Sequence, residues 1–248
     1  MAALTQNPIL RFVLTCLVCV LVLGGCVDYD VEIAFDHQHH GEIHQHLRLG
    51  EEFTNFNQQE SRKWLRSVEK RAKSLHGSVK RISQQELDVR IPFNNGEDMV
   101  EKFNRFFNPE GQNLQSDELD LVQLKSTLAL DQRNWLFFER NRATLDVDLR
   151  ALGVLSQQGS LILSPGSLLD LDVSLKTPLW SNVVSDDGFS ETVTRKDGDR
   201  LIWTLQPGQL NHLDVVFWVP SWVGLGTLGI IGLLFAGFLL KYNRLPVG

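Results

Sequence analysis

Apolar residues gather in two blocks, one near each end of the chain, and frame a mixed stretch between them. The first block covers residues 12–23 and runs into the sequence Leu-Gly-Gly-Cys, which ends at Cys26. A dozen apolar residues are too few to cross a bilayer, which takes about 20, so this block predicts a signal peptide over residues 1–25. The second block, residues 215–240, is uncharged from Trp222 onward and predicts a transmembrane helix.

The residues that flank the second block indicate its topology. Tryptophans lie at one end and Tyr242 at the other, where aromatic side chains favour the membrane interface. Lys241 and Arg244 follow at once, and such cations place the tail, residues 241–248, in the cytoplasm. The sequence thus predicts one extracytoplasmic domain, residues 26–214, beside the transmembrane helix. A buried core helix is the alternative interpretation of this block.

The residues around Cys26 resemble the lipobox of bacterial lipoproteins. The resemblance implies cleavage before Cys26 and a covalent diacylglycerol or palmitate-type acyl anchor on its thiol. An uncleaved N-terminal helix with an incidental cysteine is the alternative. The other cysteines, Cys16 and Cys19, lie inside the signal peptide, so cleavage leaves no pair for a disulfide. Because strand-like sequence starts two residues after Cys26, we expect both ends of the domain to lie close to one membrane surface.

The domain opens with alternating apolar positions that predict a β-hairpin. Apolar residues alternate up to Phe35 on the first strand and recur from Ile43 on the second. A three-residue loop over residues 39–41 keeps these apolar side chains on one face of the sheet. A two-residue loop would mix Phe35 with His46, so we predict the longer loop.

The remaining periodic segments predict two helices followed by strands. Apolar residues recur at helical spacing over residues 56–76 and 98–108. Alternation and turn residues predict strands in the rest of the domain, with Asp197 and Gly198 forming a hairpin turn. The sequence therefore predicts an α+β fold with a largely antiparallel sheet, two helices in the first half and one C-terminal transmembrane helix. The later predicted strands include residues 124–130, 135–138, 145–149, 161–163, 169–175, 192–194, 201–203 and 212–217.

Composition and motifs argue against several functions. The chain has 248 residues and a net charge of −6, and this acidic balance disfavours nucleic-acid binding. Neither a GxSxG nor an HExxH motif nor a phosphate-binding glycine loop occurs, so we predict that the protein is not an enzyme. Asp170 and Asp172 alternate with leucines, which places them on an exposed strand face.

Histidines cluster in the predicted first hairpin. Imidazole and carboxylate groups bind transition metals, and facing strands can present them together. In the predicted register, Asp36 faces His44 on the outer side of the sheet, and His46 lies two residues along. A solvated polar face is one interpretation of this cluster, and a metal site or a pH sensor is the other. The candidate ligands are Asp36, His39, Glu42, His44 and His46.

Two features could bind lipid. Cations on one face of the first helix suit anionic headgroups or an acidic partner, and an ordinary solvated face is the alternative. The aromatic stripe of Phe103, Phe106 and Phe107 could line an acyl-chain pocket or belong to the core. The cations that form the candidate headgroup-binding or partner-binding face are Arg62, Lys63, Arg66, Lys70, Arg71 and Lys73.

The order of these parts resembles a known family. The cysteine leads into a strand with Tyr29, Asp30 and Phe35, a hairpin ends in the sequence Leu-Arg-Leu-Gly at Gly50, and Trp-Thr-Leu-Gln-Pro-Gly ends at Gly208 before the last strand. This pattern resembles the LppM-type bacterial lipoproteins, in their cyanobacterial branch. The resemblance implies an extracytoplasmic α+β domain, no known catalytic residues and binding of lipids or glycolipids.

Taken together, the sequence predicts a membrane-anchored extracytoplasmic lipoprotein that binds lipid, glycolipid or a membrane-protein complex without catalysis. A histidine-rich metal-binding or pH-sensing protein, or an assembly factor of a membrane complex, is the alternative. We expect no cofactor other than the acyl group on Cys26, and membrane lipids as partners. The expected location is the inner or thylakoid membrane, with the domain on the periplasmic or lumenal side.

Overall fold

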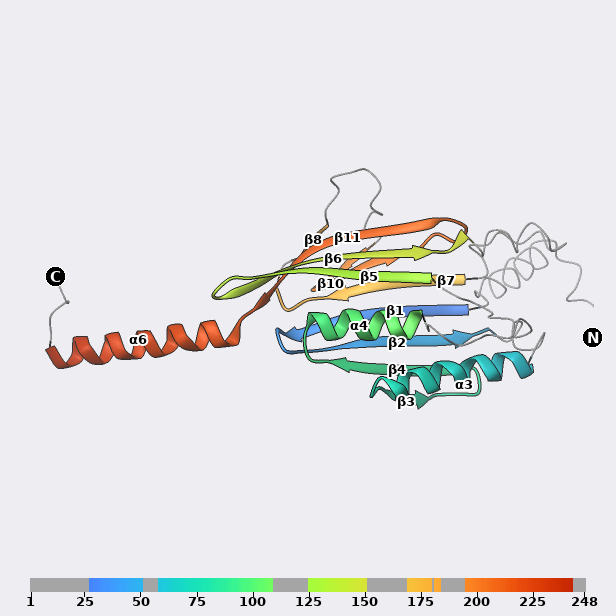
Figure 1. The fold of residues 1–248 in the computed structure, drawn as a ribbon, viewed down its shortest axis with the longest axis horizontal. Coiled ribbons are helices and arrows are strands. Elements are labelled where there is room, and N and C mark those ends of the chain that lie inside the picture. Colours follow the sequence, from blue (N-terminus) through green and yellow to red (C-terminus); the bar gives the residue numbers. More distant parts are fainter. Residues whose placement is uncertain are drawn as a thin grey trace, which may run out of the picture.

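A computed structural model describes residues 27–50, 58–108, 125–150, 169–179, 181–183 and 195–242. These residues form two β-sheets and three helices, with two of the helices in the first half of the chain (Figure 1). All described strand pairs are antiparallel except β1 with β7. The predicted α+β class with largely antiparallel sheets is confirmed.

The strands divide into a large and a small sheet. The large sheet has the spatial order β3 (Ser78–Arg81), β4 (Glu86–Phe93), β2 (His40–Leu49), β1 (Val27–His37), β7 (Leu169–Lys176), β10 (Arg200–Thr204) and β9 (Arg195–Asp197). The small sheet has the order β5 (Lys125–Asn134), β6 (Phe138–Asp148), β11 (Leu210–Pro220) and β8 (Ser181–Val183).

One face of the large sheet is apolar and buried, and the other is polar. The alternation follows from the two-residue period of a strand: on β1, Val31 and Ile33 are buried, whereas Asp30 on the opposite face is exposed. The small sheet and the helices cover the buried face. The core therefore lies in a single layer between the two sheets and under the helices.

Helices α3 (Gln58–Ser74) and α4 (Gly96–Phe107) cover the part of the large sheet that the small sheet leaves open. Helix α4 begins at Asn95, whose side-chain oxygen accepts a hydrogen bond from the backbone N–H of Asp98 at 2.8 Å. Its buried side packs against β2, β4 and β5. The core side of α3 repeats every three or four residues and consists of Trp64, Leu65, Val68 and Ala72, and the buried Leu75 follows directly after the helix.

Aromatic rings join the two sheets. The Phe35 ring of β1 lies 4.9 Å from the Phe217 ring of β11 and 5.0 Å from the Phe93 ring of β4, measured between centroids. All three side chains are buried. This contact fixes the small sheet on the large one, because aromatic pairs bury much apolar area in a defined geometry.

The register of the first hairpin differs from the prediction. His37 pairs with His40 across a two-residue turn, and a bulge at Asp36 shifts the register before Phe35 pairs with Gly41. The extra residue in the bulge restores the apolar face that a two-residue loop alone would have disrupted. The predicted three-residue loop is therefore wrong, and Glu32, not Asp36, faces His44.

Residues 135–138 were predicted as a strand, but residues 135–137 form the turn between β5 and β6, and Phe138 begins β6. Trp135 and Phe138 exchange backbone hydrogen bonds of 2.8 and 3.2 Å, with Leu136 and Phe137 at the tip. Apolar content alone suggested a strand here, but the pairing of Asn134 with Glu139 closes the hairpin.

The C-terminal helix α6 (Trp222–Tyr242) is long and apolar enough to cross a bilayer. It starts later than the predicted residue 215, because residues up to Pro220 pair with β6 as part of β11. Ser221 separates the two elements, and its carbonyl oxygen accepts a hydrogen bond from the backbone N–H of Leu225 at 2.9 Å. The chain thus passes from strand to helix through one residue.

The ends of the domain lie far apart. Strands β1 and β11 run in the same direction through the two sheets, because Phe35 meets Phe217 near the end of both. Val27 therefore lies at one end of the domain and α6 leaves from the other (Figure 1). A strand of 11 residues spans about 36 Å. The structure thus separates two chain ends that we expected to lie together at one membrane surface.

We expect Phe217→Ala to lower the free energy of unfolding by about 3–5 kcal/mol, because it leaves a cavity between the sheets. Denaturant unfolding of the full chain in detergent measures the change. Leu210→Ala, on the same strand but exposed, is the control and should cost no more than about 0.5 kcal/mol. Equal stability of the two variants would contradict the assigned core.

Candidate functional site

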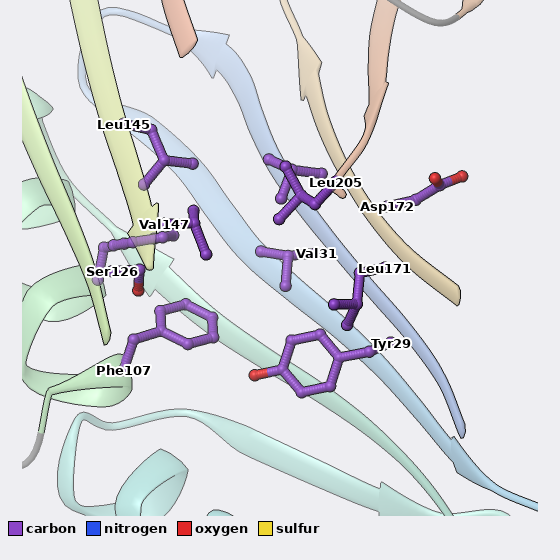
Figure 2. A pocket seen from close by; sticks show the side chains of 11 residues that line it. Tyr29, Val31, Phe107, Ser126, Leu145, Val147, Leu171, Asp172 and Leu205 are labelled. Atoms are coloured by element: carbon purple, nitrogen blue, oxygen red, sulfur yellow. The ribbon is translucent and has the colours of Figure 1, made fainter. Parts of the chain in front are cut away.

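An apolar pocket opens between the two sheets beside the last turn of α4, and we call it the inter-sheet pocket (Figure 2). Figure 2 shows the rings of Tyr29 and Phe107 facing each other across it, while the Asp172 carboxylate points away. The free space is about 20 Å³, little more than one water molecule. The pocket is lined by Tyr29, Val31, Phe103, Phe107, Ser126, Leu145, Val147, Leu171, Asp172, Val173 and Leu205.

Two asparagines hold α4 against the outer edge of β5. Asn104 exchanges hydrogen bonds with the backbone of Leu128, at 2.9 Å from its amide and 2.8 Å to its side-chain oxygen. Asn108 bonds the backbone of Ser126 in the same way. The side chains thus satisfy an otherwise unpaired strand edge and set the position of Phe107 at the pocket.

One polar atom of the pocket wall is unsatisfied. The Ser126 hydroxyl is buried and has no hydrogen-bond partner among the described residues. Leaving a buried hydroxyl without a partner costs free energy. A ligand that forms a hydrogen bond with Ser126 would therefore bind more tightly than one that does not.

A polar cluster lies behind the aromatic wall. Burial raises the pKa of Tyr29, and the charge of Arg71 and a hydrogen bond with Gln45 only partly offset this rise. The Arg71 guanidinium also lies over the Phe106 ring, 5.7 Å from its centroid. Tyr29 therefore remains protonated at physiological pH and presents a neutral hydroxyl to the interior.

Arg71 points in a different direction from the other cations of the predicted basic face of α3. Arg71 is turned toward Tyr29 and Phe106, whereas the other five cations are exposed. Among these, Lys73 pairs with Glu69 at 2.7 Å. In Figure 1, α3 lies alongside the half of the domain remote from α6. The exposed cations are Arg62, Lys63, Arg66, Lys70 and Lys73.

A second hollow, of about 300 Å³, lies on the polar face of the large sheet. Asp30 of β1 is in register with Asp172 of the parallel strand β7. Partial burial and the charge of Asp172 raise the pKa of Asp30, and burial and Asp172 likewise raise the pKa of Asp170. Two neighbouring carboxylates repel each other when both are ionised. The hollow is lined by Asp30, Glu32, His44, His46, Asp172, Ser174, Arg195, Arg200 and Ile202.

The predicted histidine site is spread over separate pairs. His44 lies 2.8 Å from Asp88, His46 lies 3.3 Å from Glu86, and Asp36 lies 2.7 Å from His40. His39 is in the exposed turn, and Glu42 lies 3.8 Å from Arg90. Among the described residues, no three His, Cys, Asp or Glu side chains converge as metal ligands would. The structure therefore does not assemble the predicted ligand set.

Cys26, the predicted lipidation site, lies outside the described residues, as do residues 1–25 of the predicted signal peptide. The same holds for residues 243–248 of the predicted tail. Val27, which is bonded to Cys26, starts β1 at the end of the domain that holds the inter-sheet pocket.

Comparison with known families gives one match over most of the chain. Residues 32–246 match the profile of a family described as protein of unknown function DUF3153. The chain belongs to the DUF3153 family. The DUF3153 match begins within β1 and extends beyond α6, so it includes most of the domain and the whole of α6.

Structure comparison found one solved structure that matches this chain. The NMR structure of the folded domain of Mycobacterium tuberculosis LppM is 13% identical and has a TM-score of 0.38. The alignment covers 80% of this chain and 93% of that domain. A sequence search of curated proteins returned no match.

We expect Asp172→Asn to lower the pKa of Asp30, because it removes the neighbouring charge and keeps the shape. The folded-state pKa of Asp30 lies above its ordinary value of 3.8, so ionisation destabilises the fold as pH rises through the raised pKa. The variant should therefore gain stability at neutral pH and lose this gain below the ordinary pKa. Carboxyl NMR titration and thermal unfolding check both effects, with Asp197→Asn at the exposed end of β9 as control. An unchanged Asp30 titration would contradict the coupling.

Proposed function

We propose that this protein is a membrane-anchored extracytoplasmic module that binds one acyl chain of a lipid or glycolipid and performs no catalysis. The observation that carries the proposal is the inter-sheet pocket, with its apolar walls and one unsatisfied hydroxyl, Ser126. A mostly apolar pocket with few polar groups is the usual form of a lipid site. Each buried methylene contributes about 0.8 kcal/mol to binding.

Phe107 controls entry in this proposal. In this structure the pocket is too narrow for an acyl chain. Phe107, the last residue of α4, forms a half-buried part of its wall. Its ring packs 4.4 Å from Phe103 and 4.9 Å from Phe106, measured between centroids. Rotation of Phe107 out of this cluster opens the pocket to a chain, and the incoming methylenes replace the lost aromatic contacts.

The membrane attachment follows the sequence-based prediction. The signal peptide directs the chain out of the cytoplasm, Cys26 receives its acyl group, and α6 crosses the inner membrane or, in a cyanobacterium, the thylakoid membrane. An acyl group on Cys26 starts three residues before Tyr29, a wall of the pocket. The acyl group on Cys26 is therefore one of the chains that can reach the pocket. The pocket itself lies about one strand length from the bilayer that α6 enters.

A second candidate function is docking of a membrane-protein complex, as in an assembly factor. The exposed cations of α3 favour it, because they form a positive face away from α6 that suits an acidic partner. Metal binding or pH sensing has weaker support, since each histidine of β2 lies beside a separate carboxylate.

Photo-crosslinking tests the lipid proposal. The full chain is reconstituted in nanodiscs that contain a phosphatidylglycerol with a diazirine in its acyl chain, and adducts are mapped by mass spectrometry. We expect adducts on the pocket residues around Phe107 and Leu145 as well as on α6. Ser126→Leu should remove the pocket adducts, because the larger side chain fills the narrow space, and leave the α6 adducts unchanged.

Thr127→Leu is the matched control, since this neighbour on β5 points to the exposed face. It should keep the pocket adducts. Adducts confined to α6 in the wild type would rule out the lipid proposal. Co-purification of one acidic membrane protein, lost in an Arg62→Gln, Arg66→Gln variant, would then favour the docking function.

We expect Cys26→Ala to abolish incorporation of radioactive palmitate, because only this thiol can carry the acyl group of the mature chain. Labelling of growing cells followed by immunoprecipitation measures it. The variant should remain in the membrane fraction through α6. Equal labelling of Cys26→Ala and wild type would contradict lipidation at this position.

A further inference from the structure

The turn between β5 and β6 exposes large apolar side chains beside the start of α6. Trp135 is 61% exposed and Leu136 is 71% exposed, at the tip of a hairpin closed by two backbone hydrogen bonds. Exposed apolar groups at a turn are costly in water, and a cluster of them marks a contact with another phase or molecule. We call residues 135–137 the hairpin tip.

Two contacts hold the hairpin tip against the first turn of α6. The Phe137 carbonyl oxygen accepts a hydrogen bond from the backbone N–H of Ser221 at 2.9 Å. Gly224 is buried against the tip, and a Cβ atom at this position would overlap the carbonyl oxygen of Leu136. The tip is therefore level with the first turn of α6, the part that enters the interface if the helix crosses a bilayer.

The order of side-chain types along this hairpin matches the order of layers at a membrane surface. Beyond the tip, Phe138 pairs with Pro220, and two residues further Arg140 pairs with Arg133 on one side and Trp218 on the other. Two strand residues span about 7 Å, which matches the depth of the interfacial layer on each side of a bilayer. Going from the hairpin tip into the domain, apolar and aromatic groups come first. The cations follow at the level of the lipid phosphates.

Two carboxylates lie near these cations: Asp131 pairs with Arg133 at 3.6 Å, with both side chains largely exposed, whereas Glu139 points to the other side of the sheet. Glu139 is buried and accepts hydrogen bonds from Gln38 at 2.8 Å and Gln132 at 2.7 Å. It therefore neither neutralises the outer cations nor meets the headgroups. Since Gln38 lies in the turn between β1 and β2, the same bond also brings the histidine-rich turn to the α6 end of the domain.

We propose that the hairpin tip is a second membrane contact, in which Trp135 and Leu136 enter the interface next to α6 while Arg133 and Arg140 bind lipid phosphate. The alternative occupants are a partner protein or a second copy of the chain. The membrane is the occupant that the contacts with Ser221 and Gly224 favour, because the tip is continuous with the surface that α6 presents to lipid. The contact lies at the opposite end of the domain from the inter-sheet pocket and stands whether or not that pocket binds lipid.

Depth-dependent fluorescence quenching tests the proposal on the full chain. A fluorescent amino acid is placed at position 136, at position 231 inside α6 and at position 82, and each protein is reconstituted in nanodiscs with or without acyl-brominated phosphatidylcholine. Ile82 is the matched control, because it is also an exposed apolar residue, 50% exposed, next to a hairpin turn, but at the end remote from α6. We expect loss of fluorescence at positions 136 and 231 and none at 82.

The cations are tested in the position-136 protein with phosphatidylglycerol in the nanodisc. Arg133→Gln with Arg140→Gln should reduce the quenching, because the tip loses its phosphate contacts and withdraws. Arg62→Gln with Arg66→Gln on α3 should leave it unchanged. Quenching at 231 without quenching at 136 would overturn the proposal, and so would absence of quenching at 231, which would place α6 outside the bilayer.

Discussion

Phe217 packs on Phe35 between the two sheets, and β11 runs from this contact through Ser221 into α6. Because one strand belongs both to the core and to the junction with the helix, the orientation of the domain is set by its own packing rather than by a flexible linker. The hydrogen bond from Ser221 to Phe137 and the close approach at Gly224 support the same junction from the side of the hairpin. The direction of α6 is therefore coupled to the direction of the strands, which it continues in Figure 1.

This coupling assigns different roles to the two ends of the domain. The end at α6 carries the hairpin tip and the histidine-rich turn, which Gln38 links to Glu139. The other end carries Val27 and the inter-sheet pocket, between the last turn of α4 and the small sheet. In the proposed function, the first end meets the membrane surface and the second receives an acyl chain at a distance from it. An acyl group on Cys26 would then lie at the pocket end rather than in the bilayer that α6 enters.

The sequence predicted those features that depend on local periodicity. Helix α3, the aromatic side of α4 and the Asp197 turn follow from spacing and turn residues, and the structure contains them. Features set by long-range packing were missed. The bulge at Asp36 reflects the need to keep the apolar face after a short turn, Arg71 turns inward because Tyr29 and Phe106 lie beneath it, and the pocket wall at Ser126 comes from a strand far along the chain. The contact of Gly224 with the hairpin tip is also of this kind, because the glycine permits a close approach whose partner lies far away in the sequence.

The central claim is that α6 holds the domain upright, with its strands directed away from the membrane. Neutron reflectometry of the full chain in a supported bilayer measures how far the protein layer extends beyond the headgroups. An upright domain should form a layer at least about 36 Å thick, the length of an 11-residue strand such as β1. A layer of only about 20 Å, the thickness of two packed sheets with their side chains, would show a domain lying flat on the membrane and would contradict the account.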